Sequence, residues 1–462
     1  MADNNIVEHN GIYLPQDYSL NSLNLLTAGG QKFELSKLMV EMSYYEDIYS
    51  FVVSGHITIM DGQGFHELLP LTGNEFIEIN FSKTSNQING INRTFRLYKM
   101  GPKITTSNMN TDIYTLYFCS EEMILSEQNK LSKSYKGQKI SDIIKNILTD
   151  TGPTGVFHLD NKRIKKIEET MGMYDFVIPK FKPFETISWL SNYARPQKSG
   201  PESGADMLFF ETKDGFNFRS LQSMFSDSIY AEYKYEAENL NKNTQNIKDK
   251  ITNVLQYEIS KPYDILNEIG SGTFANRIVT IDPLARTVDV KDFNYTDYKA
   301  KNGSLDKNAV SPELTNRLGK TQSKSPEGVL KLAFGNSAQQ DVAYVKQQGG
   351  IAKDINISTY VPNRTAQISL ANYTTIKAVI PGDPGITAGR TIKFTLMTLK
   401  PDPNLKDEDK YYSGKYLVSA VRHVLSSDGA YQTVLELSKD SSVTKYPSIN
   451  SSNPAWKKAV KS

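Results

Sequence analysis

The feature that most constrains the fold is a run of strand and turn patterns near the C-terminus. An apolar stretch leads into the Pro/Gly-rich turn Ile380–Gly389, a second begins at Thr391, and two longer ones follow at 414–424 and 431–437. Asp428-Gly429 between the last two supplies the positive φ that a tight hairpin needs. These patterns predict a small antiparallel β-unit. Its predicted core residues are Leu417, Val421, Leu435 and Leu437.

A second strand-rich block spans residues 31–120. Apolar side chains alternate with polar ones there, which is the period of a half-buried strand. The alternating residues are Val53, Gly55, Ile57 and Ile59, then Ile77, Ile79 and Phe81, then Tyr114, Leu116 and Phe118. Turn-forming clusters, Asn89-Gly90 among them, separate these runs. Several short strands at this spacing predict a barrel or a sandwich.

Residues 126–225 change to an α+β pattern. Apolar residues at helical spacing predict one helix, and they are Ile140, Ile143, Ile144, Ile147 and Leu148. A second helix is predicted to begin at Pro183 and to end at Pro196. A hairpin is predicted from 207–212 and 216–221 around Lys213-Asp214-Gly215.

The rest of the chain divides into connectors and further strands. Residues 236–250 indicate a solvated connector, 252–300 return to strands with a turn at 282–286, and 300–345 are polar throughout. The predicted organisation is 1–125 as an N-terminal β-barrel completed by part of 226–300, 126–225 as the α+β middle domain, 226–300 as a β-rich segment, 301–362 as a polar insertion or arm, 363–442 as the C-terminal part of a second β-barrel, and 443–462 as a polar tail.

Composition excludes several classes of protein. The net charge of +2 gives no global field that would draw in nucleic acid or membrane, and no apolar run reaches the length of a membrane span. The single cysteine, Cys119, forms no internal disulfide and is expected to be an inert buried thiol. We expect no signal peptide at the N-terminus, because it lacks a basic stretch followed by an apolar one.

Few sequence motifs suggest catalysis or ligand binding. The string Gly270–Ala275 matches a dinucleotide-binding fingerprint, but a short helix is predicted before it and a strand after it, so Gly270 is interpreted as a helix C-cap. Glu121-Glu122 and 407–409 are interpreted as solvated loop charges. The basic run Lys162–Lys166 could contact a polyanion, but the more economical interpretation is a solvated face.

The five histidines also lack the spacing of metal ligands, and they are His9, His56, His66, His158 and His423. No nucleophile elbow is present either. We therefore predict no catalytic, metal or cofactor-binding residues and no cofactor.

Three groups of segments together resemble the baseplate hub proteins of contractile-tailed phages. They are 33–57 with 73–81, then 136–144 with 182–187, and finally the C-terminal pattern described first, with 274–277 and its hairpin similar as well. The resemblance covers roughly two thirds of the chain, and residues 300–345 depart from it. It implies a mainly β fold with α+β parts, in which two tube-type β-barrel domains are joined by helix-containing and inserted segments.

The same resemblance implies a function without catalysis. Three chains would form a ring with pseudo-sixfold symmetry that joins the hexameric tail tube to the trimeric central spike. The implied partners are the chain itself, the central spike protein, the tail tube or tube-initiator protein, and in addition the tape measure protein and the baseplate wedge. Neither a membrane nor a specific nucleic acid is expected. The implied location is the virion baseplate, after synthesis in the host bacterial cytoplasm.

Two alternatives stay open on the sequence. One is the hub or spike-base component of a bacterial contractile injection system, which would have nearly the same fold. The other is a β-rich cell-wall hydrolase, which would gather acidic residues in a cleft.

Overall fold

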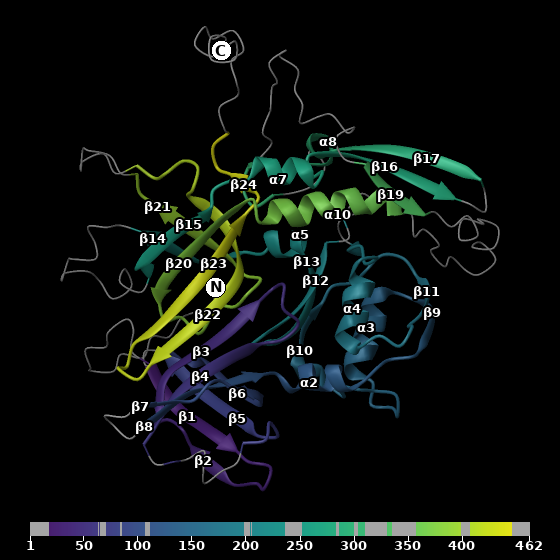
Figure 1. Cartoon of the computed structure of the whole chain (residues 1–462). Helices are drawn as coiled ribbons and strands as arrows, with labels where there is room; N and C mark the ends of the chain where they lie inside the picture. The colour runs from purple at the N-terminus through teal and green to yellow at the C-terminus, as the bar shows by residue number, and fades with distance from the viewer. Residues whose placement is uncertain are drawn as a thin grey trace.

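The fold is mainly β with smaller α+β parts, as the sequence predicts. The computed structural model of the chain describes residues 18–62, 64, 71–83, 86–106, 111–197, 204, 206–235, 252–282, 286–299, 304–309, 330–334, 357–398 and 407–445. Figure 1 shows the N-terminal strands in purple below the C-terminal strands in yellow, with the α+β part beside them. A single 14-stranded sheet contains most of the described strands of both groups.

The N-terminal strands wrap around one apolar core. They are β1 (Tyr18–Leu26), β2 (Lys32–Glu34), β3 (Met39–Asp47), β4 (Ser54–Asp61), β5 (Phe76–Lys83), β6 (Asn86–Met100), β7 (Ile104–Thr106) and β8 (Thr111–Cys119). Pairing runs in the order β3-β4-β8-β6-β5-β1-β2, and β2 leads through residues 35–38 back into β3. The chain thereby returns to the first strand of the series, and the strands curl around the common core as a barrel that is closed by packing, because β3 pairs with β4 and β22 and not with β1 or β2.

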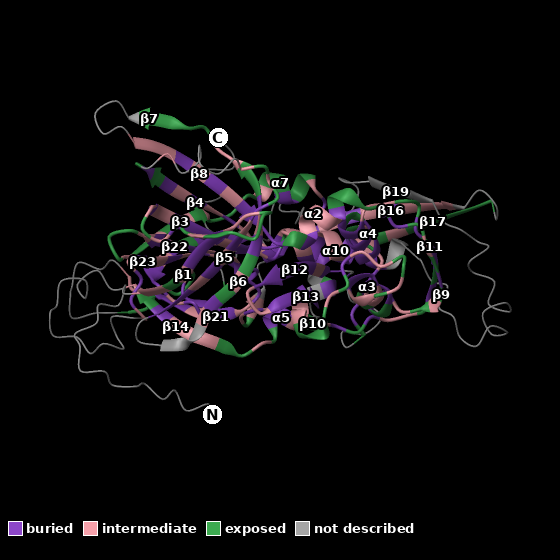
Figure 2. Ribbon diagram, turned by 90° about the horizontal axis from the view of Figure 1, so that it is seen from below, coloured by how far each residue is buried: buried purple, intermediate pink, exposed green. Residues whose placement is uncertain are grey.

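The alternating pattern correctly identified the inward face of this barrel. The side chains of Ile57, Ile77, Ile79, Leu116 and Phe118 are fully buried in its core. Figure 2 shows the same alternation as purple bands along the strands.

The predicted turn at Asn89-Gly90 is wrong. Both residues lie inside β6, where Ile91 pairs with Phe81 and the register shifts at the next step. A Cβ on Gly90 would stand 2.7 Å from the carbonyl oxygen of Phe81, so the glycine permits a close approach between strands. A glycine in a strand often marks such an irregularity.

The C-terminal strands form a second barrel. Its strands are β14 (Ile229–Tyr235), β15 (Gln256–Lys261), β20 (Thr374–Pro381), β21 (Thr391–Leu396), β22 (Gly414–Ser426) and β23 (Tyr431–Lys439). They pair in the order β14-β21-β22-β23-β20-β15. A parallel bridge between Lys234 and Asn253 closes the ring, with the N–H of Val254 donating to the carbonyl of Lys234 at 2.8 Å.

Two outcomes concern this second barrel. The predicted core residues Leu417, Val421, Leu435 and Leu437 are buried, and Gly429 has the expected positive φ of 87°. However, the strands of 226–300 that join the large sheet, β14 and β15, pair with β21 and β20, so they complete this barrel and not the N-terminal one. The alternation of apolar and polar residues identifies a strand, but it does not specify which distant strand will pair with it.

Strand β22 belongs to both barrels. One edge pairs with β23 along nearly the whole strand. The other edge pairs with β21 at 414–417 and with β3 from Ala420 to Ser426. The two barrels are therefore one continuous hydrogen-bonded sheet, joined by segments that lie almost 380 residues apart.

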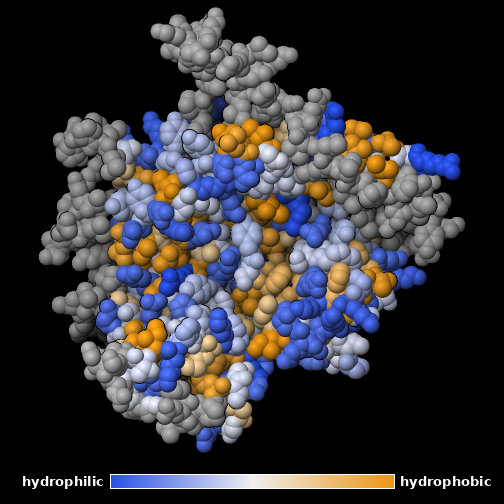
Figure 3. Space-filling view, viewed as in Figure 1, coloured by the Kyte–Doolittle hydropathy of each residue, from blue (hydrophilic) through white to orange (hydrophobic). Residues whose placement is uncertain are grey.

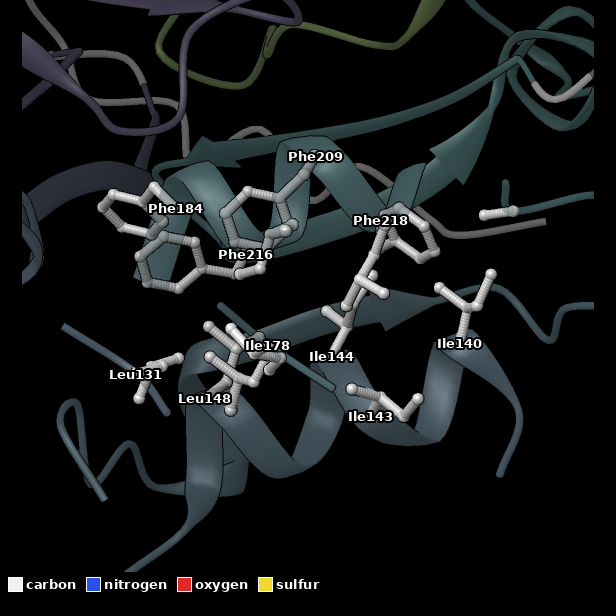
Figure 4. Packing of buried hydrophobic residues seen from close by; sticks show 14 of the residues in the cluster. Leu131, Ile140, Ile143, Ile144, Leu148, Ile178, Phe184, Phe209, Phe216 and Phe218 are labelled. Carbon is white, nitrogen blue, oxygen red and sulfur yellow. The ribbon is translucent and has the colours of Figure 1, made fainter. Parts of the chain in front are cut away.

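The α+β unit follows the N-terminal barrel in the chain. It contains α2 (Glu121–Gln128), β9 (Ser134–Gln138), α3 (Ile140–Thr149), the 3-10 turn η1 (Asn161–Arg163), β10 (Ile164–Ile167), β11 (Tyr174–Val177), α4 (Pro183–Ser191), β12 (Met207–Thr212), β13 (Gly215–Ser220) and α5 (Leu221–Phe225). The predicted apolar stripe of α3 packs against phenylalanines of β12 and β13 (Figure 4). The predicted end of the second helix at Pro196 is wrong, because α4 already ends at Ser191.

A third part contains the short helix predicted before Gly270 together with further helices that the sequence analysis missed. Its elements are α7 (Ile265–Gly270), β16 (Ala275–Asp282), β17 (Thr287–Asn294), α8 (Tyr295–Lys299), β18 (Asn308–Ala309), β19 (Leu330–Phe334), α10 (Ile357–Ala371) and β24 (Ser441–Ser442). The antiparallel pairing of β16 with β17 confirms the two strands predicted on either side of 282–286, and residues 283–285 lie outside the described residues. Helix α10 crosses the predicted boundary at 362–363 and contains Pro362, a residue that normally argues against a helix interior.

Several predicted segments lie outside the described residues. The connector at 236–250 and the tail beyond residue 445 are wholly outside them, and of the polar stretch 300–345 only 304–309 and 330–334 are described. The domain boundaries as a whole stay a prediction.

Candidate functional site

The histidines singled out in the sequence do not come together where they are described. His56 lies in β4, His158 in the loop before η1 and His423 in β22, whereas His9 and His66 are outside the described residues. Within the described part of the chain, no group of three His, Cys, Asp or Glu side chains could hold a metal ion.

His423 and Cys119 are both buried in strands. The hydroxyl of Tyr431 lies 2.8 Å from Nδ1 of His423, and burial lowers the pKa of this histidine to about 3, with the charge of Lys213 acting in the same direction. The imidazole is therefore neutral and acts as a packing group. Burial likewise raises the pKa of the Cys119 thiol to about 12, which agrees with the expected buried, unreactive thiol.

The glycine-rich string also has the predicted context. Helix α7 ends at Gly270 and is followed by β16, the reverse of a dinucleotide-binding order. The residue that caps this helix is Ser271, one residue later than predicted, and the left-handed residue that follows it is Gly272, with φ of 73°.

The most distinctive polar arrangement is instead a buried junction between the two barrels and the α+β unit. Glu46, at the end of β3, is 1% exposed. Its carboxylate accepts the backbone N–H of Lys213, in the β12–β13 turn, at 2.6 Å and that of Ala388, in the β20–β21 loop, at 3.0 Å. One side chain of the N-terminal barrel thus binds the backbone of both other units. Burial raises its pKa to about 7, although both N–H donors oppose the rise.

A second buried carboxylate, Glu211 of β12, lies at the same junction. Arg93 of β6 donates to it at 2.5 Å and Arg163 of η1 at 2.9 Å. It also accepts the hydroxyl of Ser120 at 2.5 Å and the N–H of Val53 at 3.0 Å. Because buried charges are costly unless they are paired and hydrogen-bonded, these four donors explain how Glu211 can be fully buried.

One prediction about acidic residues is wrong. Glu122 was interpreted as a solvated loop charge, but it lies in the first turn of α2, is 7% exposed and binds Arg163 at 3.0 Å. Burial raises its pKa, and the nearby carboxylate of Glu211 adds to the rise. Glu121, by contrast, remains half exposed.

The chemistry of this junction is structural. Glu46 and Glu211 are enclosed, and their oxygens are occupied by donors from different units, so they hold the units at fixed distances. Sequence reasoning missed both residues, although one signal was present. Met42, Tyr44 and Glu46 alternate along β3, which places a carboxylate on the buried face of a strand.

Among the described residues, no helix is both long and apolar enough to cross a membrane.

Comparison with known proteins supports the fold. No protein-family model matches the sequence, and no curated protein matches it. Among solved structures, the tail protein from Neisseria meningitidis MC58 is similar with a TM-score of 0.51 and 11% identity, over 92% of this chain and 97% of that one. The 43 kDa tail protein of prophage MuSo2 from Shewanella oneidensis gives a TM-score of 0.50 and 8% identity, over 91% and 98%. At such identities the likeness shows the fold alone, and it extends over nearly the whole chain.

Proposed function

We propose that this chain is the structural baseplate hub of a contractile phage tail. Three copies form a ring that joins the hexameric tail tube to the trimeric central spike, and the chain carries out no catalysis. The tape measure protein and the baseplate wedge are further proposed neighbours, and the proposed location is the virion.

The observation that carries this proposal is the pair of barrels joined through β22. A chain with two barrels lets three copies present six barrels to a hexameric partner and three equivalent faces to a trimeric one. The fused sheet supports this role, because it fixes the angle between the two barrels through backbone hydrogen bonds. The fold shared with two tail proteins, over nearly their full lengths, supports it as well.

The surface also supports an assembling protein. Around α7, three large apolar side chains are exposed: Tyr263 by 63%, Leu266 by 85% and Ile269 by 43%. Figure 3 shows an orange patch over this helix. Exposed apolar patches often mark contact surfaces. We include the α7 surface, defined by these three residues, in the proposed contact between neighbouring copies.

Light scattering coupled to size-exclusion chromatography tests the proposal. The expected mass of the chain alone is about three times 51.9 kDa. If the ring forms only with a trimeric spike protein, the complex should exceed that mass by the mass of the spike. A chain that stays monomeric over a wide concentration range and also fails to form a ring with the spike would refute the hub.

A further inference from the structure

A basic pocket lies between the α+β unit and the C-terminal barrel. Its volume is about 370 Å³. One wall is formed by β10 and β13, and the other by the loop that precedes β21. The charged side chains that line it are Lys165, Lys166, Arg219, Arg390, Asp214 and Asp227. Lys165 and Lys166 belong to the basic run that stood out in the sequence.

Positive charge exceeds negative charge in this pocket. Asp214 is shared between Lys165, at 3.4 Å, and Arg390, at 3.8 Å. Asp227 pairs with Arg219 at 2.8 Å. No carboxylate of the described residues lies within ion-pairing distance of Lys166. Four cations therefore face two carboxylates, and the pocket has a net charge that favours an anion.

One of these cations also has a free donor. Arg219 is 8% exposed, and its Nη2 donates to Ser223 and Asp227. Its Nε–H is buried and finds no acceptor among the described residues. A buried donor without a partner costs free energy, and because this nitrogen is shielded from solvent, an acceptor in the pocket could reach it only after a shift of the surrounding side chains.

The strand beside the pocket indicates the shape of the ligand. β10 is an edge strand of its three-stranded sheet, which runs in the order β10-β13-β12. Lys165 and Lys166 also line a second pocket of about 510 Å³, between β10 and α3. An extended peptide can add to a free strand edge and place side chains in pockets beside it. A compact ion would use only one of these hollows.

We propose that the basic pocket, together with the free edge of β10, binds an extended acidic polypeptide segment from a partner protein. Its carboxylates would lie against Lys165, Lys166 and Arg390. This site adjoins the buried junction, since Ala388 lines the pocket and donates to Glu46. It goes beyond the proposed hub role, on which it does not depend.

The test measures binding of fluorescein-labelled hexaglutamate to the full chain by fluorescence anisotropy at low ionic strength, with labelled hexaglutamine as the uncharged probe. We expect saturable binding of hexaglutamate only. The double variant Lys165→Gln/Lys166→Gln should weaken it by about tenfold, which corresponds to about 1.4 kcal/mol. Both lysines are exposed, so the fold should be unaffected, and an unchanged melting temperature checks this.

The matched control is Lys130→Gln/Lys162→Gln, which removes the same charge from exposed positions that line neither pocket. This variant should bind hexaglutamate as the parent does. An equal loss in both variants would show general charge attraction and overturn the site. Competition by inorganic phosphate as strong as that by unlabelled hexaglutamate would show a small-anion site and overturn the peptide assignment. Hexaglutamine binding as tight as hexaglutamate would show that the site does not recognise negative charge and would overturn the acidic assignment.

Discussion

At the residue scale, Glu46 makes the stability of the molecule depend on pH. Its pKa is raised from 4.5 to about 7 in the folded protein, so the folded state holds a proton that the unfolded state releases between these values. The free energy of unfolding should therefore fall as pH rises through about 4.5 to 7. Burial raises the pKa of Asp206 to about 7 as well, which adds to the same slope.

The variant Glu46→Gln tests this assignment. It keeps a carbonyl acceptor for one of the two N–H groups, places an NH2 group against the other, and cannot ionise, so it should be less stable than the parent at low pH. We expect a shallower decline of the melting temperature between pH 5 and 8 than in the parent, with Asp206 accounting for the remaining slope. Each unit of pKa shift corresponds to about 1.4 kcal/mol. Parallel pH profiles for the two proteins would show that Glu46 does not titrate in this range.

Arg93 should contribute far more to stability than a surface cation does. It is paired with a fully buried carboxylate, and removal of one partner of a buried pair typically costs about 3–5 kcal/mol. We expect Arg93→Met to lower the free energy of unfolding by about that amount in urea titrations. The matched control is Lys32→Met, which breaks the exposed pair with Glu78 and should cost less than about 1 kcal/mol. Equal effects of the two changes would contradict the junction.

These residues also show how far the sequence could predict the site. The sequence alone could show that the histidines lack the spacing of metal ligands, because that spacing depends only on positions along the chain. The alternation of Glu46 with Met42 and Tyr44 could have predicted that this acidic residue lies on the buried face of β3. Its partners could not be predicted, since Lys213 and Ala388 are brought to Glu46 only by the tertiary fold.

At the scale of elements, β22 and β23 are paired neighbouring strands of the C-terminal barrel. Leu437 of β23 is fully buried and pairs with Val418 of β22. We expect Leu437→Ala to cost about 2–5 kcal/mol, because truncation of a buried leucine leaves a cavity. Val290→Ala on the exposed strand β17 is the control and should have little effect. An unchanged melting temperature for Leu437→Ala would show that this strand is not part of the core.

Elements with a local signature could be predicted from the sequence, and long-range pairings could not. The apolar stripe of α3 and the hairpin at Asp428-Gly429 are encoded within a few residues, and both were confirmed. The pairing of β3 with β22 depends on two strands whose patterns fit many partners equally well. Helix α10 was missed because Pro362 opposes a helix locally, whereas Ala366 and Leu370 pack it onto its neighbours.

At the scale of the whole molecule, the α7 surface should matter for assembly and not for folding. Leu266 is 85% exposed, so Leu266→Glu should leave the melting temperature of the isolated chain unchanged while it lowers the fraction of trimer in light scattering. Ile104→Glu is the matched control, because Ile104 is 64% exposed on β7 of the N-terminal barrel. If both variants assemble like the parent, α7 does not lie at the contact between copies.

The most direct test of the account is electron microscopy of the assembled full-length chain, viewed along the ring axis. Two barrels in each of three chains predict class averages with true threefold symmetry and six barrel-sized densities around a central opening. Six densities with strict sixfold symmetry, a ring with another number of chains, or particles without a ring under conditions that also include the spike would contradict the proposed hub.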